Sequence, residues 1–544
     1  MVNIVSPFVR GFQVPAWVQA ACGGLLTTLT VPPFGLWPLA IPGIALLFTA
    51  LLTADQRLSD ALDSSNRRKP PSRLGRSRHT FRLSLLWASC LYVPSLWWMT
   101  AFSVPGGIFV GLLEATITAV VMMALVPGGQ IKRVAEARRA AGVVGGLVIA
   151  DSLRSLWPFG GLPLGGIDLG QANGWFAPIV SWFGRLGLVG LVSCIATGLV
   201  LTARRVGDTD AHRRRRYATQ SICVLGVALA LPAIAAATAG TDRATTPTAS
   251  PENTRTVLVV QGGGPRGLLA SSDNARKTFD AHFEATREAL NKGGPLPNLI
   301  LWPENTVDAD TFAMSERFKQ LQQFNGTFLS VGITEDGGPT EFLNAQVLIG
   351  PDGTVVDRYD KVRRVPFGEF FPLRKQIESW GLADLPNREA RKGTRAGTLR
   401  GANTYGVLIS YEGFFDDRAR NAVNAGAEVL LIPTNASSYK TTQLPSQQVA
   451  AAQLRALETH RDTFQAGPTG YSAFISAAGK VSNLTQLGAR EVFTHTYHAR
   501  TNRTLYVRFN DTLALALAAL LLIFANLPNP PLENPKPPTH ARTI

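Results

Sequence analysis

The sequence predicts a polytopic α-helical membrane domain of about eight spans, joined to a layered α/β domain that lies outside the cytoplasm. Two observations support this fold class. First, 46% of the 544 residues are hydrophobic, and they concentrate before about residue 240 and again near residues 512–526. Second, short apolar runs alternate with helical patterns between these regions, which is typical of layered α/β domains. A chain of this length also predicts at least two structural units.

Apolar stretches of spanning length define the membrane part, because a helix needs about 20 mainly apolar residues to cross a bilayer. They lie at about 14–31, 36–54, 83–103, 106–126, 140–157, 184–203 and 218–239, with a shorter eighth near 512–526. Only one positive charge, Arg10, precedes the first stretch, and a second stretch follows the turn at Pro32 and Pro33. We therefore interpret the first stretch as a membrane helix and not as a signal peptide.

The net charge of +15 is concentrated in loops between the spans. Basic residues gather at 55–82, 127–139 and 204–217, whereas the turns near 32–35 and 104–107 carry no Lys or Arg. Loops rich in Lys and Arg stay in the cytoplasm. The pattern therefore predicts a multi-pass protein of the cell (inner or plasma) membrane with its α/β domain outside. We expect no nucleic-acid partner, because the positive charges act as topology signals.

Domain boundaries follow from changes in composition. We expect a transmembrane domain of about seven helices over residues 1–240, a Thr/Pro/Ser-rich linker over 241–254 and the α/β domain over 255–508. A C-terminal transmembrane helix over 509–527 then returns the chain to the cytoplasm. The Pro-rich tail over 528–544 is predicted to be disordered.

Cysteine usage indicates neither a disulfide framework nor a zinc site. The four cysteines lie in apolar runs without a CxxC spacing: Cys22, Cys90, Cys194 and Cys223. Residues 262–267 match GxGxxG after a predicted strand, but Pro265 interrupts the match and the helix begins several residues later. We interpret this segment as a strand-end turn and not as a dinucleotide site. No metal and no cofactor are expected.

Short, partly β-branched apolar runs predict the strands of the outer domain. These runs are Val257–Gln261, Leu299–Trp302, Phe328–Ile333, Ala345–Ile349, Val407–Ile409 and Val429–Pro433. Helical patterns fall at about 272–291, 313–323, 416–425 and 446–462. Alternation on this scale predicts a layered α/β domain of about 250 residues.

Three segments place chemically useful side chains at strand ends. They are Leu301–Asn305 with Glu304, Tyr359–Pro372 with Lys361 and Glu369, and Gly406–Glu412 with Ser410. A glutamate after a buried strand suits a general base. Lys361 and Glu369 share a loop that is too apolar to be explained as an ordinary solvent-exposed loop. A small hydroxyl residue ends a strand before a helix, whose N-terminus would stabilise negative charge. Taken alone, each segment is equally typical of ordinary polar residues at strand ends.

In their order and setting, the three segments resemble the Glu, Lys and Cys segments of the nitrilase superfamily. Membrane spans on both sides narrow the resemblance to apolipoprotein N-acyltransferases. It covers about residues 14–526 and includes Pro-Phe-Gly-Leu-Trp-Pro at 33–38; Val-Pro-Phe-Gly-Glu-Phe-Phe-Pro at 365–372 is its most specific part. The resemblance implies that the outer domain is a nitrilase-like catalytic sandwich with αββα layers.

The resemblance also implies residue roles: Glu304 as the general base, Lys361 as the group that stabilises the tetrahedral oxyanion, Glu369 as a supporting glutamate, and Tyr411 and Glu412 as the residues after the nucleophile. The implied reaction is a ping-pong acyl transfer through an acyl-enzyme. A membrane phospholipid would give a fatty acyl group to the enzyme, which passes it to the free amino group of the diacylglyceryl-cysteine of an apolipoprotein. A covalent intermediate divides one difficult transfer into two easier ones.

The nucleophile position departs from the family, because Ser410 stands where the family has cysteine and no cysteine follows residue 250. A serine hydroxyl is far less acidic than a thiol. Two functions therefore stay open: an acyltransferase that uses Ser410, and a catalytically impaired paralogue that acts as a lipid- or lipoprotein-binding scaffold or as the partner of another membrane enzyme. The four ionisable groups kept at the site favour the enzyme. Hydrolysis of a small amide is a distant third, since it would not need a membrane.

Two further features leave alternatives open. Asp151 and Arg154 lie at i, i+3 in the fifth apolar stretch, where charges are costly, so they form either a structural ion pair or part of a lipid site. Aromatic pairs at 370–371 and 414–415 suit either a lid that faces the membrane or core packing.

Overall fold

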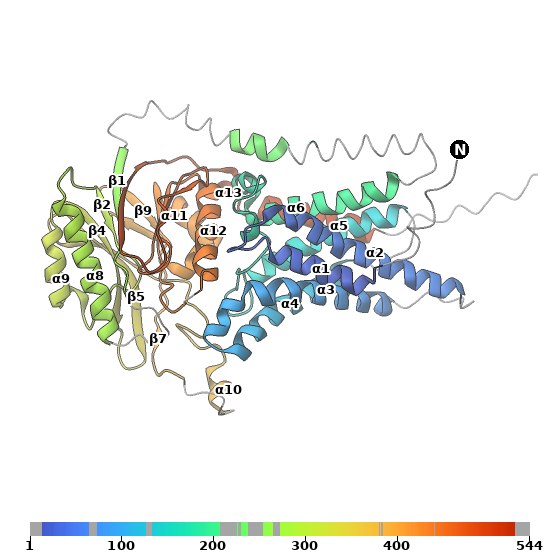
Figure 1. The fold of residues 1–544 in the computed structure, drawn as a ribbon, viewed down its shortest axis with the longest axis horizontal. Coiled ribbons are helices and arrows are strands. Elements are labelled where there is room, and N and C mark those ends of the chain that lie inside the picture. The colour runs from blue at the N-terminus through green and yellow to red at the C-terminus, as the bar shows by residue number, and fades with distance from the viewer. Residues whose placement is uncertain are drawn as a thin grey trace, which may run out of the picture.

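A bundle of long helices carries the α/β domain at one end in the computed structural model (Figure 1). The structure describes residues 14–64, 73–126, 133–206, 226, 230–237, 254–264, 272–379, 381, 385–439 and 441–527. Residues 241–253 of the predicted linker, the C-terminal tail and most of the predicted span at 218–239 therefore lie outside the described residues, whereas Thr254 begins the first strand of the outer domain.

The long helices of the bundle are α1 (Ala16–Thr28), α2 (Ala40–Ser64), α3 (Arg73–Ser95), α4 (Val104–Leu125), α5 (Arg133–Arg154), α6 (Val180–Val206) and α14 (Thr512–Asn526). Among the described residues, three segments are long and apolar enough to cross a membrane: Trp37–Leu58, Val104–Leu125 and Ala177–Arg205. Helices α3 and α5 start inside basic segments, so their apolar parts are shorter. The expectation of about eight spans stays a prediction.

The outer domain contains two sheets. One has the strand order β14-β1-β2-β4-β5-β6, with β3 paired to β4 and β7 paired to β5; the other has the order β13-β12-β11-β10-β9-β8. The strands of the first sheet are β1 (Thr254–Gln261), β2 (Leu299–Leu301), β3 (Val307–Ala309), β4 (Phe328–Asp336), β5 (Glu341–Ile349), β6 (Val355–Asp360), β7 (Glu389–Ala390) and β14 (Glu491–His498). Those of the second are β8 (Thr398–Arg400), β9 (Thr404–Val407), β10 (Val429–Pro433), β11 (Thr463–Ala466), β12 (Ala473–Ile475) and β13 (Val481–Ser482).

The helices of the outer domain are α8 (Ser272–Asn291), α9 (Glu316–Leu321), α10 (Arg374–Ser379), α11 (Asp416–Asn424), α12 (Gln443–Thr459) and α13 (Leu505–Phe509). Each predicted strand is present, but two end early. Strand β2 ends at Leu301, so the expected strand at Leu299–Trp302 is wrong for its last residue, and β9 ends at Val407, so the expected strand at Val407–Ile409 is wrong for its last two residues. The helix expected at 313–323 is an α-helix only over Glu316–Leu321, with short 3₁₀ turns on both sides.

Alternating side chains build the layers of this domain, because successive residues of a strand point to opposite faces. Val257 and Val259 of β1 pack against the second sheet in a core that includes Leu431 of β10. Leu258 and Val260 face the other way, onto α8. Helices α11 and α12 cover the outer face of the second sheet. The expected αββα sandwich is confirmed (Figure 1).

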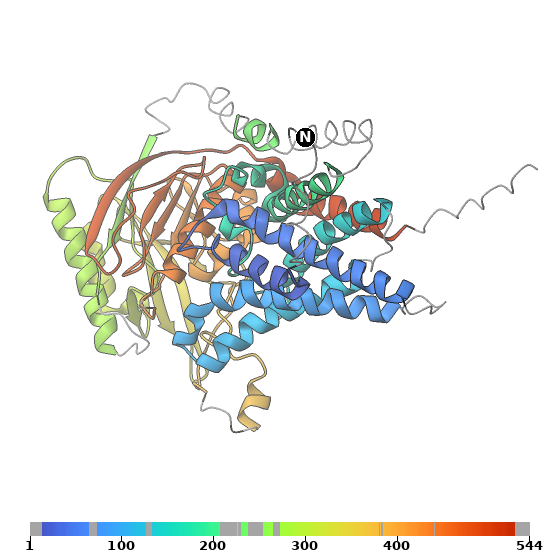
Figure 2. The ribbon, with the colours of Figure 1, turned by 45° about the vertical axis from the view of Figure 1, so that its right-hand side comes forward.

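The helical layer of α11 and α12 lies between the second sheet and the long helices (Figures 1 and 2). Helix α12 is therefore covered on both sides, and Gln447–Thr459 are all buried. One hydrophobic core runs from Val189 of α6 to Leu454 of α12, and it includes Phe414 and Phe415. The alternative of core packing is thus confirmed for these two phenylalanines.

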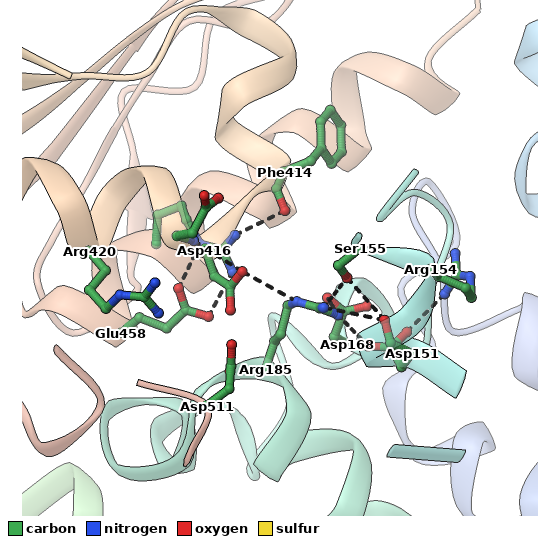
Figure 3. A network of polar contacts seen from close by, with 12 residues as sticks. Asp151, Arg154, Ser155, Asp168, Arg185, Phe414, Asp416, Arg420, Glu458 and Asp511 are labelled. Carbon is green, nitrogen blue, oxygen red and sulfur yellow. Dashed lines mark hydrogen bonds and ion pairs between the residues drawn. The ribbon is translucent and has the colours of Figure 1, made fainter. Parts of the chain in front are cut away.

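Buried charges cross the same boundary (Figure 3). The Arg154 guanidinium pairs with Asp151 at 2.8 Å, as the i, i+3 spacing predicts, and also with Glu114. Arg185 of α6 pairs with Asp151 and reaches Asp416, the first residue of α11, at 3.7 Å. Since each of these charges is almost fully buried, the network ties the bundle to the start of α11.

Candidate active site

A buried ammonium lies between two carboxylates in the outer domain. The Lys361 Nζ atom is 2.8 Å from Oε1 of Glu304 and 2.8 Å from Oε1 of Glu369. The amide group of Asn344 donates to the same two oxygens, at 2.9 Å and 2.8 Å. Lys361 and Glu304 are 2% and 4% exposed. Three of the residues expected at the site therefore form one hydrogen-bonded cluster.

Strands of the first sheet position this cluster. Glu304 follows β2, Lys361 follows β6, and Asn344 lies on β5, which pairs with β6. The backbone N–H of Lys361 donates to the carbonyl of Asn344 at 2.9 Å, which fixes the start of the loop. Gly332 of β4 lets the turn at Glu304 lie close, because a Cβ there would come within 2.2 Å of the Pro303 carbonyl oxygen.

Glu369 reaches the cluster from the Val-Pro-Phe-Gly-Glu turn. Its Oε2 atom accepts a hydrogen bond of 2.8 Å from the backbone N–H of Val365, and its own N–H donates to the Val365 carbonyl at 2.8 Å. Phe367, within the turn, adopts a left-handed φ of 61°. The tight turn leaves one carboxylate oxygen of Glu369 directed at Lys361.

The cluster keeps Lys361 charged. Burial by itself lowers the pKa of Lys361, but the charges of Glu304 and Glu369 outweigh it and hold the pKa above its usual value. A fixed ammonium in a dry site stabilises negative charge that develops on a nearby carbonyl oxygen. A carboxylate beside it can accept a proton from a nucleophile.

Ser410 lies where β9 gives way to a 3₁₀ turn, Ser410–Phe414. Its φ is +52°, which is uncommon for a non-glycine residue and is often found at functional sites. The Ser410 Oγ atom has a long contact of 3.4 Å with the hydroxyl of Thr434, which accepts a hydrogen bond of 2.5 Å from Gln448. Ser410 begins a 3₁₀ turn, so the expected helix N-terminus at this position is wrong; α11 begins six residues later.

Glu412 joins the serine turn to the lysine loop. Its carboxylate accepts hydrogen bonds from the Tyr359 hydroxyl at 2.7 Å and from the backbone N–H groups of Val362 at 2.9 Å and Arg363 at 3.1 Å. It also accepts from the N–H of Ile409 at 2.9 Å, within its own turn. Glu412 is fully buried. These bonds fix the backbone on both sides of Ser410 against the residues on both sides of Lys361.

Tyr411 connects the same turn to the membrane half of the protein, which is the helix bundle with its connecting turns. The Tyr411 hydroxyl donates to the carbonyl of Gly161, in the turn after α5, at 2.8 Å. The sequence pattern did not indicate a role for three residues of the site: Asn344, Tyr359 and Arg418. The Arg418 guanidinium donates to the Tyr359 hydroxyl at 2.6 Å. The only sequence signal for Asn344 is a polar residue inside an apolar strand.

The fold and the lysine–glutamate cluster define a membrane-helix protein with a carbon–nitrogen hydrolase domain. The family model of that domain matches residues 269–503, and the model of the apolipoprotein N-acyltransferase N-terminal domain matches residues 23–198. The two models together account for most of the chain, which belongs to the apolipoprotein N-acyltransferase family.

Three relatives named apolipoprotein N-acyltransferase illustrate the similarity. One from Geobacter metallireducens is 25% identical over 94% of this chain and 95% of its own. One from Mycolicibacterium smegmatis is 28% identical over 85% of this chain and 77% of its own. One from Sinorhizobium fredii is 31% identical over 41% of this chain, and this match spans only 44% of that relative.

Proposed function

We propose that this protein transfers a fatty acyl group from a membrane phospholipid to the N-terminal amino group of diacylglyceryl-cysteine in apolipoproteins. The observation that carries the proposal is the bond between Tyr359 and Glu412, which holds the Ser410 turn beside the loop of Lys361. The relative from Geobacter metallireducens, which aligns with 94% of this chain, bears the name of this activity.

In the first step, the carboxylate of Glu304 takes the proton of Ser410 as the serine oxygen attacks the ester carbonyl of the phospholipid. The new bond leaves a negative charge on the carbonyl oxygen, which the ammonium of Lys361 stabilises. The ester C–O bond then breaks, and Glu304 returns the proton to the leaving lysophospholipid oxygen. The product is an acyl-serine.

In the second step, the free amino group of the lipoprotein cysteine attacks the acyl-serine carbonyl. Glu304 takes a proton from the nitrogen, Lys361 again stabilises the oxyanion, and the bond between the acyl carbon and the serine oxygen breaks. The proton passes to the Ser410 oxygen, so the enzyme returns to its starting state. The net reaction converts an ester and an amine into a lysophospholipid and an amide.

The positive-inside pattern of the basic loops supports an outer domain on the extracytoplasmic side of the cell membrane, anchored by the helices on both sides of it. Both proposed substrates are held in the bilayer by their acyl chains. An enzyme whose domain is packed on membrane helices meets both of them at the membrane surface.

The test is mass spectrometry of lipoprotein N-termini from cells that lack the gene. We expect the N-linked acyl chain to be lost and to return with the wild-type gene, but not with Glu304→Gln or Ser410→Ala. Arg287→Gln, a change on exposed α8, is the matched control and should restore acylation. Unchanged triacylation in the deletion strain, or full rescue by Ser410→Ala, would overturn the proposal; the second result would favour the scaffold role.

A further inference from the structure

A pocket of about 290 Å³ opens where the membrane half meets the outer domain. The turn Phe159–Gly161, which follows α5, forms one wall, and Val362–Arg364 of the lysine loop forms another. Phe159 also packs edge-on against Phe367 of that loop, with ring centroids 5.6 Å apart. The pocket therefore depends on both halves of the protein.

The lining of this pocket is strongly cationic. It carries Arg363, Arg364, Lys392 and Arg418, against one carboxylate, Asp417. Asp417 pairs with Arg363 at 2.8 Å, and Arg418 is committed to Tyr359 and Glu412. Within the described ranges, neither Arg364 nor Lys392 has a carboxylate partner.

Arg364 is held ready for a ligand. Its Nη1 atom donates to the carbonyl of Ala390 at 2.9 Å, and its guanidinium lies over the ring of Phe370, 4.4 Å from the centroid. Both contacts fix the orientation of the guanidinium and leave its charge uncompensated. A planar guanidinium with N–H groups to spare matches two oxygens of a phosphate.

The pocket adjoins both parts of the candidate active site. Val362, in its wall, follows Lys361, and Tyr411, also in its wall, follows Ser410. Trp157, two residues before Phe159 of the wall, is 55% exposed. Tryptophans gather at the level of lipid headgroups, so an exposed tryptophan beside the pocket suits a ligand that carries a lipid phosphate.

We propose that this pocket binds the phosphodiester headgroup of the donor phospholipid through Arg364 and Lys392. The inference rests on the proposed function, since it names where the donor of that reaction is held. Binding the phosphate here would place the ester linkages of the same lipid next to the Ser410 turn. The pocket supplies no acid or base; it positions the donor.

The test measures binding of dihexanoyl phosphatidylglycerol to the purified full-length protein in detergent by isothermal titration calorimetry. Substituting both cations, as Arg364→Gln with Lys392→Gln, should weaken binding about 10-fold or more, because each removes a charge-assisted contact. Arg287→Gln, which lies on α8 outside the pocket, should bind as the wild type does. The wild-type affinity should also fall as salt is added.

Two further ligands distinguish the sources of affinity. Dihexanoylglycerol, which lacks the phosphate, should bind equally to the wild type and to the double variant. Inorganic phosphate should compete with the phospholipid. Equal phospholipid affinity of the wild type and the double variant, or failure of phosphate to compete, would overturn the inference. The single variant Lys392→Gln is included as a variant that should fold normally. The exposed Lys392 side chain has no hydrogen-bond or ion-pair partner among the described residues, so its exchange removes no contact that supports the fold.

Binding and turnover separate this inference from the proposed function. Ser410→Ala should bind the phospholipid as tightly as the wild type does, although it cannot form the acyl-serine. Binding that depends on Arg364 and Lys392, in a protein that transfers no acyl group, would leave the headgroup site in place and overturn only the function. Acyl transfer with unchanged KM for the phospholipid in the double variant would overturn only the headgroup site.

Discussion

The hydroxyl of Tyr359 donates a hydrogen bond of 2.7 Å to the carboxylate of Glu412. Tyr359 lies at the end of β6, two residues before Lys361, and Glu412 lies two residues after Ser410. One bond thus joins the two sheets at the place where the ammonium and the serine hydroxyl are held. Burial and the charge of Glu412 hold the pKa of Tyr359 well above its usual value, so the phenol keeps its proton and acts as the donor.

Tyr359→Phe should lower activity more than it lowers stability. The variant removes one donor to Glu412 but leaves the three backbone N–H donors, so we expect a loss of about 1–2 kcal/mol in the free energy of unfolding. Acyl transfer should fall further, because the serine turn and the lysine loop lose a direct link. Thermal unfolding and kcat of the purified protein measure both effects, and Tyr471→Phe is the matched control. Equal activity of the two variants would contradict this role for Tyr359.

Ser410→Cys should keep or raise acyl transfer, whereas Ser410→Ala should abolish it. A thiol ionises far more readily than a hydroxyl. Residue 410 has a left-handed backbone, which a β-branched residue would strain, but neither Cys nor Ala is β-branched. Intact-protein mass spectrometry after exposure to a phospholipid should detect a covalent acyl adduct for Ser and Cys. An adduct on the Ala variant would show that the nucleophile lies elsewhere.

Lys361→Met should destabilise the protein and abolish activity. Removing the ammonium leaves the buried Glu304 and the partly buried Glu369 without a cation, and breaking a buried pair in this way costs about 3–5 kcal/mol. Adding Glu304→Gln and Glu369→Gln to Lys361→Met should recover much of the stability but none of the activity. Unfolding in denaturant and acyl transfer assays check the two halves of this prediction. An active triple variant would contradict the role of the cluster.

Arg185→Gln should loosen the outer domain from the helix bundle. Arg185 pairs with Asp151 and lies 3.7 Å from Asp416. Its loss leaves Asp416 without this cation, while Asp151 keeps Arg154, so it should cost about 3 kcal/mol. A double-mutant cycle with Asp416→Asn should show strong coupling between the two positions. Arg204→Gln, on an exposed pair with Glu136, is the control and should change stability little. Additive effects of Arg185→Gln and Asp416→Asn would refute the link.

His282 should make stability depend on pH between about 6.5 and 4. Burial lowers the pKa of His282 to about 4, while the unfolded chain keeps the ordinary value near 6.5. A depressed pKa means that the stabilisation is complete above pH 6.5 and is lost as the pH falls toward 4, amounting to about 3 kcal/mol. His282→Gln should flatten thermal stability across this range. A parallel pH profile in the variant and the wild type would contradict the assignment.

The strand end that carries Glu304 was predictable, because a buried apolar run followed by a polar residue is visible in a single sequence. The strand before Lys361, β6, was not among the predicted strands, because most of its residues are not buried and carry no apolar run. The tight Val-Pro-Phe-Gly-Glu turn was equally visible as a motif. The roles of Asn344 and Arg418 were not, since each is an ordinary polar residue whose partners lie 25 to 59 positions away in the chain.

The sequence alone determined the alternation of apolar stretches, basic loops and strand runs, because hydrophobic periodicity and loop charge are local properties of the chain. Only the tertiary structure decided that Glu412 bridges the serine turn to the lysine loop, and that Arg185 links α6 to α11. These contacts join residues far apart in sequence, and they depend on which faces of two sheets and which helices pack together. No local pattern encodes that choice, since the same residue types suit many pairings.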